Sequence, residues 1–342
     1  MKNVLVTGGA GFIGSNFIHF LLEHEPECQI HNLDVLTYSG SLENLRDIEK
    51  EPRYHFIKGD ICDTKNDFLV VEQNKIDTIV HFAAETHVDR SIIEPGQFMQ
   101  TNIFGTYSLL EAARSYWSIT KNLCRFHHIS TDEVFGTLRI GEPPWTEDFP
   151  YAPNSPYSAS KASSDHIVRS YGHTFGLPYT ITNCSNNYGP YQFPEKLIPV
   201  IILNALEKKP LPVYGDGQQI RDWLHVQDHC EAIWTVLKKG VPGNSYNIGC
   251  GNQPTNLSIV EKICDLLDEM QPVSNSRREL IHFVKDRPGH DRRYALNSSK
   301  IQNELGWSAR HGLETGLRQT VKWYMENPEW IAVIKKQIEY QT

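Results

Sequence analysis

Apolar and polar residues alternate along the first half of the chain in a pattern that predicts strands separated by helices. Short runs rich in β-branched and aromatic residues, which favour strands, recur between longer stretches of helical spacing. The longer stretches include "FIGSNFIHFLLEH" and "GTYSLLEAARSYW". The predicted strands span residues 3–8, 30–34, 54–60, 78–84, 125–130 and 179–183. Repeated βαβ units of this kind predict an α/β fold, a doubly wound parallel sheet of Rossmann type.

The pattern loosens after about residue 185, where prolines and mixed elements become frequent. We expect a first unit at residues 1–185, to which 222–249 returns through the strand-like "SYNIG". Residues 186–221 and 250–330 are expected to form a smaller, interleaved lobe, followed by a tail at 331–342. Ligands of doubly wound sheets bind at the carboxyl ends of the strands. We therefore expect the binding site between the sheet and the lobe.

Composition narrows the class of protein. A net charge of −8 over 342 residues argues against general nucleic-acid binding, which needs a basic face. No long apolar run predicts a membrane span, and the opening "MKNVLVTGG" favours a strand over a signal peptide. The seven cysteines are scattered without a Cys-x-x-Cys pair, and no histidine set suggests a metal site. We expect a cytoplasmic protein that holds no metal.

A glycine-rich loop follows the first predicted strand and opens a helix. The segment "VTGGAGFIGS" contains Gly8, Gly9, Gly11 and Gly14. Such glycines permit a tight turn and let the backbone approach a pyrophosphate at the helix N-terminus. The loop therefore predicts a dinucleotide site, the alternative being a purely structural turn.

Two acids follow the next strands. Asp34 comes about twenty positions after Gly14, where a carboxylate accepts hydrogen bonds from an adenine ribose. Its charge would repel a 2′-phosphate, so NAD is favoured over NADP; the alternative is a helix-capping Asp. Asp60 is expected to end the third strand, either near the adenine amine or as a turn cap.

The segment "NSPYSASK" contains a Tyr157-x-x-x-Lys161 pair. Pro156 predicts a helix start, and residues four apart then share a face, so the ammonium can approach the phenol. A free Tyr has a pKa near ~10, which a neighbouring cation lowers toward the range of a general base. The spacing alone is weak evidence, because Tyr54-x-x-x-Lys58 repeats it in a predicted strand.

Thr131, Asp132 and Glu133 stand side by side in "HHISTDEVFG", just after the fifth predicted strand. Adjacent carboxylates repel each other, so a site that holds them close raises the pKa of one of them. Taken alone, an Asp-Glu pair at a strand end is more often a solvated turn.

Together these residues resemble the extended short-chain dehydrogenase/reductase family. The resemblance extends from Lys2 to about Tyr324 through the strings "FAAETHVDRSI", "STDEVFG", "CSNNYGPYQFPEKLIP", "YGDGQQIRDWLHVQDH" and "DRPGHDRRYA". Within that family the strings are similar to nucleotide-sugar 4,6-dehydratases, whose thymine and uracil types share them. Phe135 stands where members often have Tyr, and we expect this difference to have a small effect on the reaction.

The resemblance implies a lyase reaction on a nucleotide sugar, with dTDP-glucose as the leading substrate and NAD as cofactor. Tyr157 would take the proton of the C4 hydroxyl while hydride leaves C4, with Lys161 beside it. Glu133 would remove the C5 proton, and Asp132 would protonate the departing 6-hydroxyl. Thr131 would hydrogen-bond the C4 oxygen. The hydride would then return to C6.

Further site residues follow from the same resemblance. The residues expected at the cofactor are Gly8, Gly11, Phe12, Ile13, Gly14, Asp34, Thr37, Asp60, Ile61, Ala83, Ala84, Thr101, Tyr157, Lys161 and Asn187. Those expected at the substrate are Thr86, Thr131, Asn186, Lys196, Leu197, Pro212, Tyr214, Arg221, Asn256, Asp286, Arg287 and His290. Arg221 is the candidate clamp for the substrate pyrophosphate, because a guanidinium pairs with phosphate oxygens.

Three alternatives remain. A UDP-glucose 4,6-dehydratase and a nucleotide-sugar epimerase or decarboxylase would use the same scaffold. Epimerases generally lack the acid pair, whereas decarboxylases and GDP-mannose 4,6-dehydratases keep the Glu without the preceding Asp, so Asp132 discriminates. A binding protein that has lost its chemistry would be expected to lack Tyr157, Lys161 or an acid. The resemblance also implies a homodimer formed by helices near 97–117 and 157–176.

Overall fold

A parallel sheet of seven strands forms the centre of the protein, whose computed structural model describes residues 1–120 and 124–339. The strands lie in the order β10-β6-β5-β4-β1-β2-β3, and every neighbouring pair is parallel. Their bounds are Asn3–Thr7 (β1), Gln29–Asp34 (β2), Tyr54–Lys58 (β3), Thr78–His81 (β4), Arg125–Thr131 (β5), Tyr179–Cys184 (β6) and Ser245–Ile248 (β10). All the predicted strands are present, so the α/β fold is confirmed. β10 adds a strand beside β6 at one edge.

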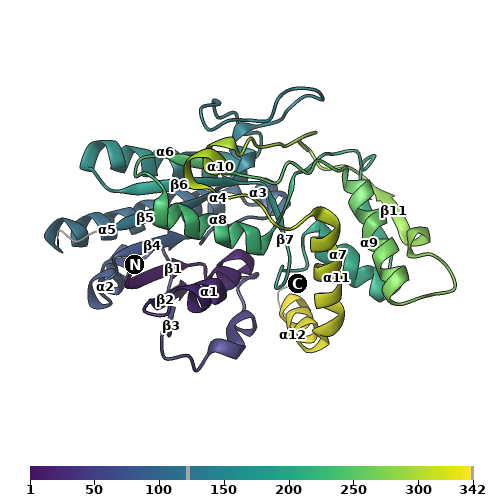
Figure 1. Ribbon diagram of the computed structural model, residues 1–342, viewed down its shortest axis with the longest axis horizontal. Helices are drawn as coiled ribbons and strands as arrows, with labels where there is room; N and C mark the ends of the chain where they lie inside the picture. Colours follow the sequence, from purple (N-terminus) through teal and green to yellow (C-terminus); the bar gives the residue numbers. More distant parts are fainter. Residues whose placement is uncertain (121–123, 340–342) are drawn as a thin grey trace.

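Helices cover both faces of this sheet (Figure 1). The covering helices are α1 (Phe12–His24), α2 (Thr64–Gln73), α5 (Thr106–Thr120), α6 (Pro156–Phe175) and α8 (Val226–Lys239). α1 packs beside α8 on one face, while α5 packs between α2 and α6 on the other. The sheet is thus the middle of three layers.

Alternation along β1 explains why both faces are covered. Val4 and Val6 pack with Phe17 of α1 in one apolar core. Leu5 points to the opposite face and packs in a second core with Leu109 of α5. Successive side chains of a strand point to opposite faces, and the central residues of β1 are apolar on both, so this strand needs helices on both sides.

The remaining elements form a lobe and the segments that join it to the sheet. They are η1 (Leu42–Ile48), α3 (Val88–Ile93), α4 (Pro95–Phe98), η2 (Met99–Gly105), η3 (Asp132–Phe135), β7 (Asn186–Tyr188), α7 (Leu197–Leu206), β8 (Leu211–Tyr214), β9 (Trp223–His225), α9 (Asn256–Met270), η4 (Arg277–Leu280), β11 (Ile281–Val284), α10 (Ser299–Leu305), α11 (Leu313–Glu326) and α12 (Pro328–Glu339). β8 pairs with β11, and β7 with β9. Figure 1 shows α7, α9, α11 and α12 grouped beyond the sheet. Their apolar faces share a core of their own.

The local sequence fixes where α6 begins and ends. Ser155 and Ser158 form a capping box, Pro156 occupies the first turn, and Gly176 closes the helix at φ 69°. Each of these features is a strong helix boundary signal. In the adjacent sheet Thr131 pairs with Cys184, so β5 and β6 end at the same edge. α6 therefore starts beside the strand ends.

Candidate active site

A cavity of about 690 Å³ lies at the carboxyl ends of the strands, between the sheet and the lobe. Its wall includes every residue predicted for catalysis and for the cofactor, together with the residues predicted for the substrate except Asp286. Asp286 instead stands behind the wall, where its carboxylate lies 2.6 Å from Nδ1 of His290 and accepts a 3.0 Å hydrogen bond from Gln219. Its side chain contacts His290, and its predicted contact with the substrate stays a prediction.

The glycine loop fits a dinucleotide phosphate. Gly8 adopts φ 69°, and a Cβ there would lie 2.6 Å from the main-chain nitrogen of Ala83. A Cβ on Gly14 would run into the carbonyl oxygen of Gly8. Gly11 precedes α1 without a side-chain cap, so the first N–H groups of this helix point toward the cavity with no capping side chain. These are the features that let a backbone approach a pyrophosphate.

Asp34 combines a place on the cavity wall with main-chain hydrogen bonds, and its contact with an adenine ribose stays a prediction. Its carboxylate accepts hydrogen bonds from the main-chain nitrogens of Ala10 (2.9 Å) and Leu36 (2.8 Å), and it also lines the cavity. Burial raises its pKa. Asp60 lies beyond β3, which ends at Lys58, and accepts from the main-chain nitrogen of Cys62 at 2.9 Å. The strand therefore ends two residues earlier than expected, and the chain turns at Ile61 and Cys62, just after Asp60.

Tyr157 and Lys161 occupy successive turns at the start of α6, and both side chains are buried. Nζ of Lys161 donates a 2.7 Å hydrogen bond to the carbonyl oxygen of Ile129. Burial lowers the pKa of Lys161 to about 8. Burial, with the carboxylate of Glu133 next in importance, raises the pKa of Tyr157. This direction is opposite to the lowering that the Tyr-Lys spacing predicts, because the ammonium donates to the main chain while burial and a carboxylate oppose the phenolate.

The acid pair begins η3, directly after β5. Thr131 caps this short helix by accepting a hydrogen bond from the main-chain nitrogen of Glu133 at 3.2 Å. Asp132 is 2% exposed, and its Oδ2 has no hydrogen-bond partner among the described residues. Burial first, and then Glu133, raise the pKa of Asp132 well above its ordinary value. The acid form of Asp132 is therefore favoured, chiefly by burial and further by its neighbour Glu133.

Glu133 is partly exposed on the cavity wall, in a different electrostatic setting. Burial raises its pKa, but the cations Arg287, Arg221 and Lys196 oppose that rise. Arg221 is 4% exposed and is held by the carbonyl oxygens of Ile220 and Asp291 at 2.8 and 2.9 Å. Arg221 acts on both acids, but Glu133 also faces Arg287 and Lys196, whereas Asp132 does not.

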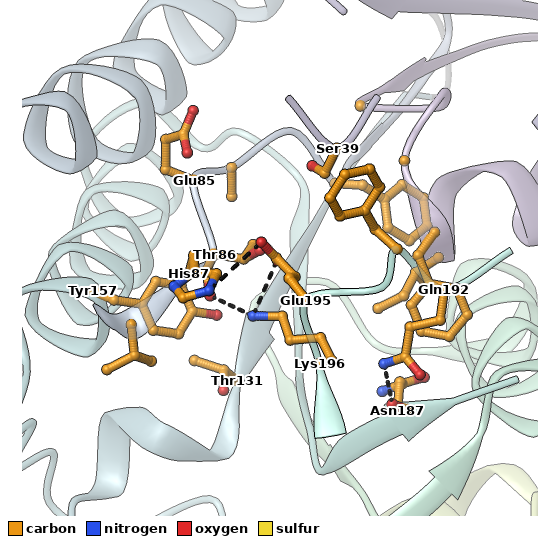
Figure 2. A pocket seen from close by; sticks show the side chains of 18 of the residues that line it. Ser39, Glu85, Thr86, His87, Thr131, Tyr157, Asn187, Gln192, Glu195 and Lys196 are labelled. Carbon is orange, nitrogen blue, oxygen red and sulfur yellow. Dashed lines mark hydrogen bonds and ion pairs between the residues drawn. The ribbon is translucent and has the colours of Figure 1, made fainter. Parts of the chain in front are cut away.

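Sequence reasoning did not assign Glu195, although the string "YQFPEKLIP" contains it. Figure 2 shows Glu195 and Lys196 on the cavity wall across from Tyr157 and Thr131. Glu195 lies 3.5 Å from Nζ of Lys196 and 3.7 Å from Nε2 of His87. Lys196 also donates to the carbonyl oxygen of Thr86 at 3.0 Å. The sequence offered one signal for Glu195: it directly precedes Lys196, a predicted substrate residue, in a segment that contains two prolines.

The part of the cavity wall predicted to face the nucleotide carries buried polar atoms without hydrogen-bond partners in the described part of the chain. Among the described residues, Oδ1 of Asn186, Oδ1 of Asn256 and Nε of Arg287 are buried without a hydrogen-bond partner. Buried polar atoms are rarely left unpaired, so they fit a polar ligand. Tyr214 stands edge-on to His290, with ring centroids 6.4 Å apart. These groups come from β7, β8, the start of α9 and the loop after β11.

Comparisons with known proteins agree with this geometry. The sequence model of a family described as GDP-mannose 4,6 dehydratase matches residues 5–320. A dTDP-glucose 4,6-dehydratase of Salmonella typhimurium is 54% identical over 97% of this chain and 95% of its own length. One from Haemophilus influenzae is 54% identical over 96% of this chain and 99% of its own. The chain belongs to the dTDP-glucose 4,6-dehydratase family.

A solved structure of a dTDP-glucose 4,6-dehydratase from Bacillus anthracis, in complex with NAD, resembles this chain with a TM-score of 0.88. It is 47% identical, over 98% of this chain and 100% of that one. A UDP-glucose 4-epimerase from Thermotoga maritima has a TM-score of 0.84 at 28% identity, over 95% and 99% of the two chains. The dTDP-glucose 4,6-dehydratase scaffold is therefore shared with epimerases. The fold alone therefore does not separate the two chemistries.

The described residues include neither a membrane-spanning helix nor a metal-binding cluster. None of their helices combines the length and apolar character that a membrane span requires. Within the same ranges, no cluster of three or more His, Cys, Asp or Glu side chains is arranged to hold a metal ion.

Proposed function

We propose that this protein converts dTDP-glucose to dTDP-4-keto-6-deoxyglucose with NAD as a returning hydride carrier. The observation that carries the proposal is the convergence of Tyr157, Asp132 and Glu133 on one cavity beside the glycine loop. The names of the relatives support the substrate and the cofactor. Loss of water across C5 and C6 needs a base and an acid on neighbouring carbons, and two adjacent carboxyl groups suit that geometry.

Bound NAD supplies the acceptor for hydride from C4 and a positive ring that favours the Tyr157 phenolate. Tyr157 accepts the proton of the C4 hydroxyl, and Thr131 hydrogen-bonds the same oxygen. The resulting ketone acidifies the hydrogen at C5. Glu133 takes that proton; burial raises its pKa, and the cations Arg287, Arg221 and Lys196 oppose that rise. Asp132, whose pKa is raised by burial, delivers a proton to the departing 6-hydroxyl.

The nucleotide is bound by the lobe in this proposal. Arg221 and Arg287 offer guanidinium groups to the pyrophosphate oxygens. Pro212, Tyr214 and Asn256 lie on the wall where the base and the deoxyribose would rest. Lys196 adds a further cation, and His290, whose pKa burial lowers, adds a polar ring. Asn186 and Leu197 would contact the substrate from the same wall.

Base preference is tested by assaying dTDP-glucose, UDP-glucose and GDP-mannose side by side. We expect kcat/KM for dTDP-glucose to exceed that for UDP-glucose by about tenfold or more, because one methyl group in an apolar contact is worth roughly that factor. The 4-keto-6-deoxy product is measured by its absorbance at alkaline pH, and no net NAD should be consumed. An epimer as the main product from any of the three sugars would contradict the dehydratase proposal.

We also propose a homodimer formed by the α5–α6 face. Large apolar side chains are exposed there: Met99, Phe104, Tyr107 and Phe175 range from 38% to 52% exposed. The rings of Phe104 and Tyr107 lie 5.6 Å apart, which makes a continuous apolar surface. Exposed patches of this kind mark protein interfaces, and a second copy of the chain supplies a matching face.

Phe104→Glu is expected to convert the dimer to a monomer, because it places a charge at the centre of this face. Light scattering coupled to gel filtration measures the molar mass. Ile140→Glu is the matched control: Ile140 is 74% exposed in the loop after η3, and its replacement should leave the mass unchanged. A Phe104→Glu protein of unchanged mass would contradict the proposed interface.

A further inference from the structure

A fully buried carboxylate lies behind the catalytic Lys161, away from the cavity. Asp165 follows Lys161 by one turn of α6 and is 0% exposed. Its Oδ2 accepts hydrogen bonds from the hydroxyl groups of Ser130 (2.8 Å) and Tyr151 (2.7 Å). Ionised carboxylates are rarely buried this completely unless they are paired, so the partner matters.

His128 of β5 connects the carboxylate to Lys161. Its Nε2 lies 3.2 Å from Oδ1 of Asp165 and 3.5 Å from Nζ of Lys161. The same ammonium is anchored to the carbonyl oxygen of Ile129. Asp165, His128 and Lys161 therefore form one continuous polar chain, which runs from the interior to the cavity wall.

Among the described titratable groups around Asp165, His128 and Lys161, only Asp165 carries a negative charge. The groups that face it are His81 of β4, His128 of β5, Cys184 of β6, Tyr157 and Arg169 of α6, and Tyr151 of the preceding loop. Burial shifts the pKa of both histidines down, to about 4 for His128, and the pKa of the thiol and of both phenols up. Those groups are neutral near pH 7. Burial raises the pKa of Asp165, but His128, Lys161 and Arg169 together outweigh burial. The net effect is a pKa below the ordinary value, so this carboxyl stays ionised.

We propose that Asp165 is a positioning residue for the reaction: held by His128, Ser130 and Tyr151, its carboxylate keeps the Lys161 ammonium charged and in place at the cavity wall. The inference rests on the proposed function, since it concerns the same site. A buried ammonium loses its hydration, and a nearby anion compensates for that loss. Because Asp165 does not line the cavity, it acts through Lys161 and not on the sugar.

Asp165→Asn in the full-length enzyme tests the proposal, because the amide keeps the shape and removes the charge. The pKa of Lys161 should fall by about one pH unit or more. The alkaline limb of the kcat–pH profile should move to lower pH by the same amount. At a fixed pH on that limb, kcat falls about tenfold for each pH unit that the limb moves, while KM for dTDP-glucose changes less than about threefold. ¹³C NMR of the lysine Cε atoms, assigned with Lys161→Arg, reports the same change in pKa independently of turnover.

Tyr151→Phe is the matched control. It removes one hydrogen bond from the same carboxylate but keeps the charge, so the pH profile should retain its shape even if the melting temperature falls. A uniform loss of kcat at every pH in Asp165→Asn, with an unmoved Lys161 resonance, would reduce Asp165 to a structural role and overturn the proposal. Failure of the unmodified enzyme to dehydrate dTDP-glucose would instead refute the proposed function.

Arg169→Gln keeps the proposal testable if Asp165→Asn does not fold. The Arg169 guanidinium is partly buried, donates to the hydroxyl groups of Tyr151 and Ser245 at 3.0 Å, and lowers the pKa of Asp165. Without this competing cation Asp165 interacts more strongly with Lys161. The alkaline limb should then move to higher pH, and a move to lower pH would contradict the proposal.

Discussion

Simultaneous replacement of Asp132 by Asn and Glu133 by Gln is expected to stop water loss while hydride still leaves the sugar. Neither amide can exchange a proton at C5 or at the 6-hydroxyl, and each acid–base group typically supplies about 10²–10⁴ in rate. The 4-keto-6-deoxy product should therefore form at least about 10⁴ times more slowly. The absorbance of reduced nicotinamide should build up after mixing with dTDP-glucose, because the C4 oxidation does not need these acids. A double variant that turns over normally would refute the assignment.

Glu147→Gln with Asp148→Asn is the control for that experiment. This second adjacent acid pair also follows a Thr, but Asp148 is exposed and Glu147 accepts a 2.8 Å hydrogen bond from the main-chain nitrogen of Asn247. Neither side chain lines the cavity. Turnover should stay within about threefold of the unmodified enzyme, as is usual for surface substitutions. Comparison of the two double variants shows whether activity depends on where the acids lie or only on their being adjacent in sequence.

Tyr157→Phe is expected to lower kcat by about 10²–10⁴, because it removes the group that accepts the C4 hydroxyl proton. The loss should lie in the oxidation step, so no reduced nicotinamide should accumulate, in contrast to the acid double variant. Affinity for NAD, measured by fluorescence quenching, should change little, since the ring of residue 157 still fills its place. Stopped-flow absorbance distinguishes the two variants directly.

Tyr54→Phe is the control for the other Tyr-x-x-x-Lys match. Its hydroxyl accepts a 2.9 Å hydrogen bond from Nδ2 of Asn32 inside the sheet, away from the cavity. It should cost about 1 kcal/mol of stability, the usual contribution of one hydrogen bond, and leave kcat near its original value. A comparable loss of kcat in both Tyr variants would show that the spacing carries no chemistry.

Strand periodicity and strand-end residues account for what the sequence predicts well. Buried parallel strands tend to be apolar on both faces, so a run such as residues 4–6 is visible without any tertiary information. In a doubly wound sheet the strand ends converge on one edge, and this rule brings Gly8, Asp34 and Thr131 to one cavity wall. Their separation along the chain therefore does not hide the site.

The buried face of α6 is what sequence patterns do not predict. Helix periodicity assumes an apolar inner face, yet Ser160, Lys161, Ser164 and Asp165 of α6 are all buried. Polar residues can occupy such a face only when tertiary partners satisfy them, and those partners lie on β5 and in loops far away in sequence. Glu195 was missed for the same reason, because its partner His87 meets it only in the folded chain.

The path of the chain between sheet and lobe limits how this enzyme can be re-engineered. Lobe elements α7 and β8 come before β9, α8 and β10, whereas α9 and β11 come after them, and β10 covers the edge of β6. A chimera that exchanged everything after residue 185 would replace the edge strand and its covering helix together with the nucleotide-facing segments. Transfer of base preference between relatives therefore calls for two separate grafts, one on each side of residues 223–248, with the original edge strand left in place.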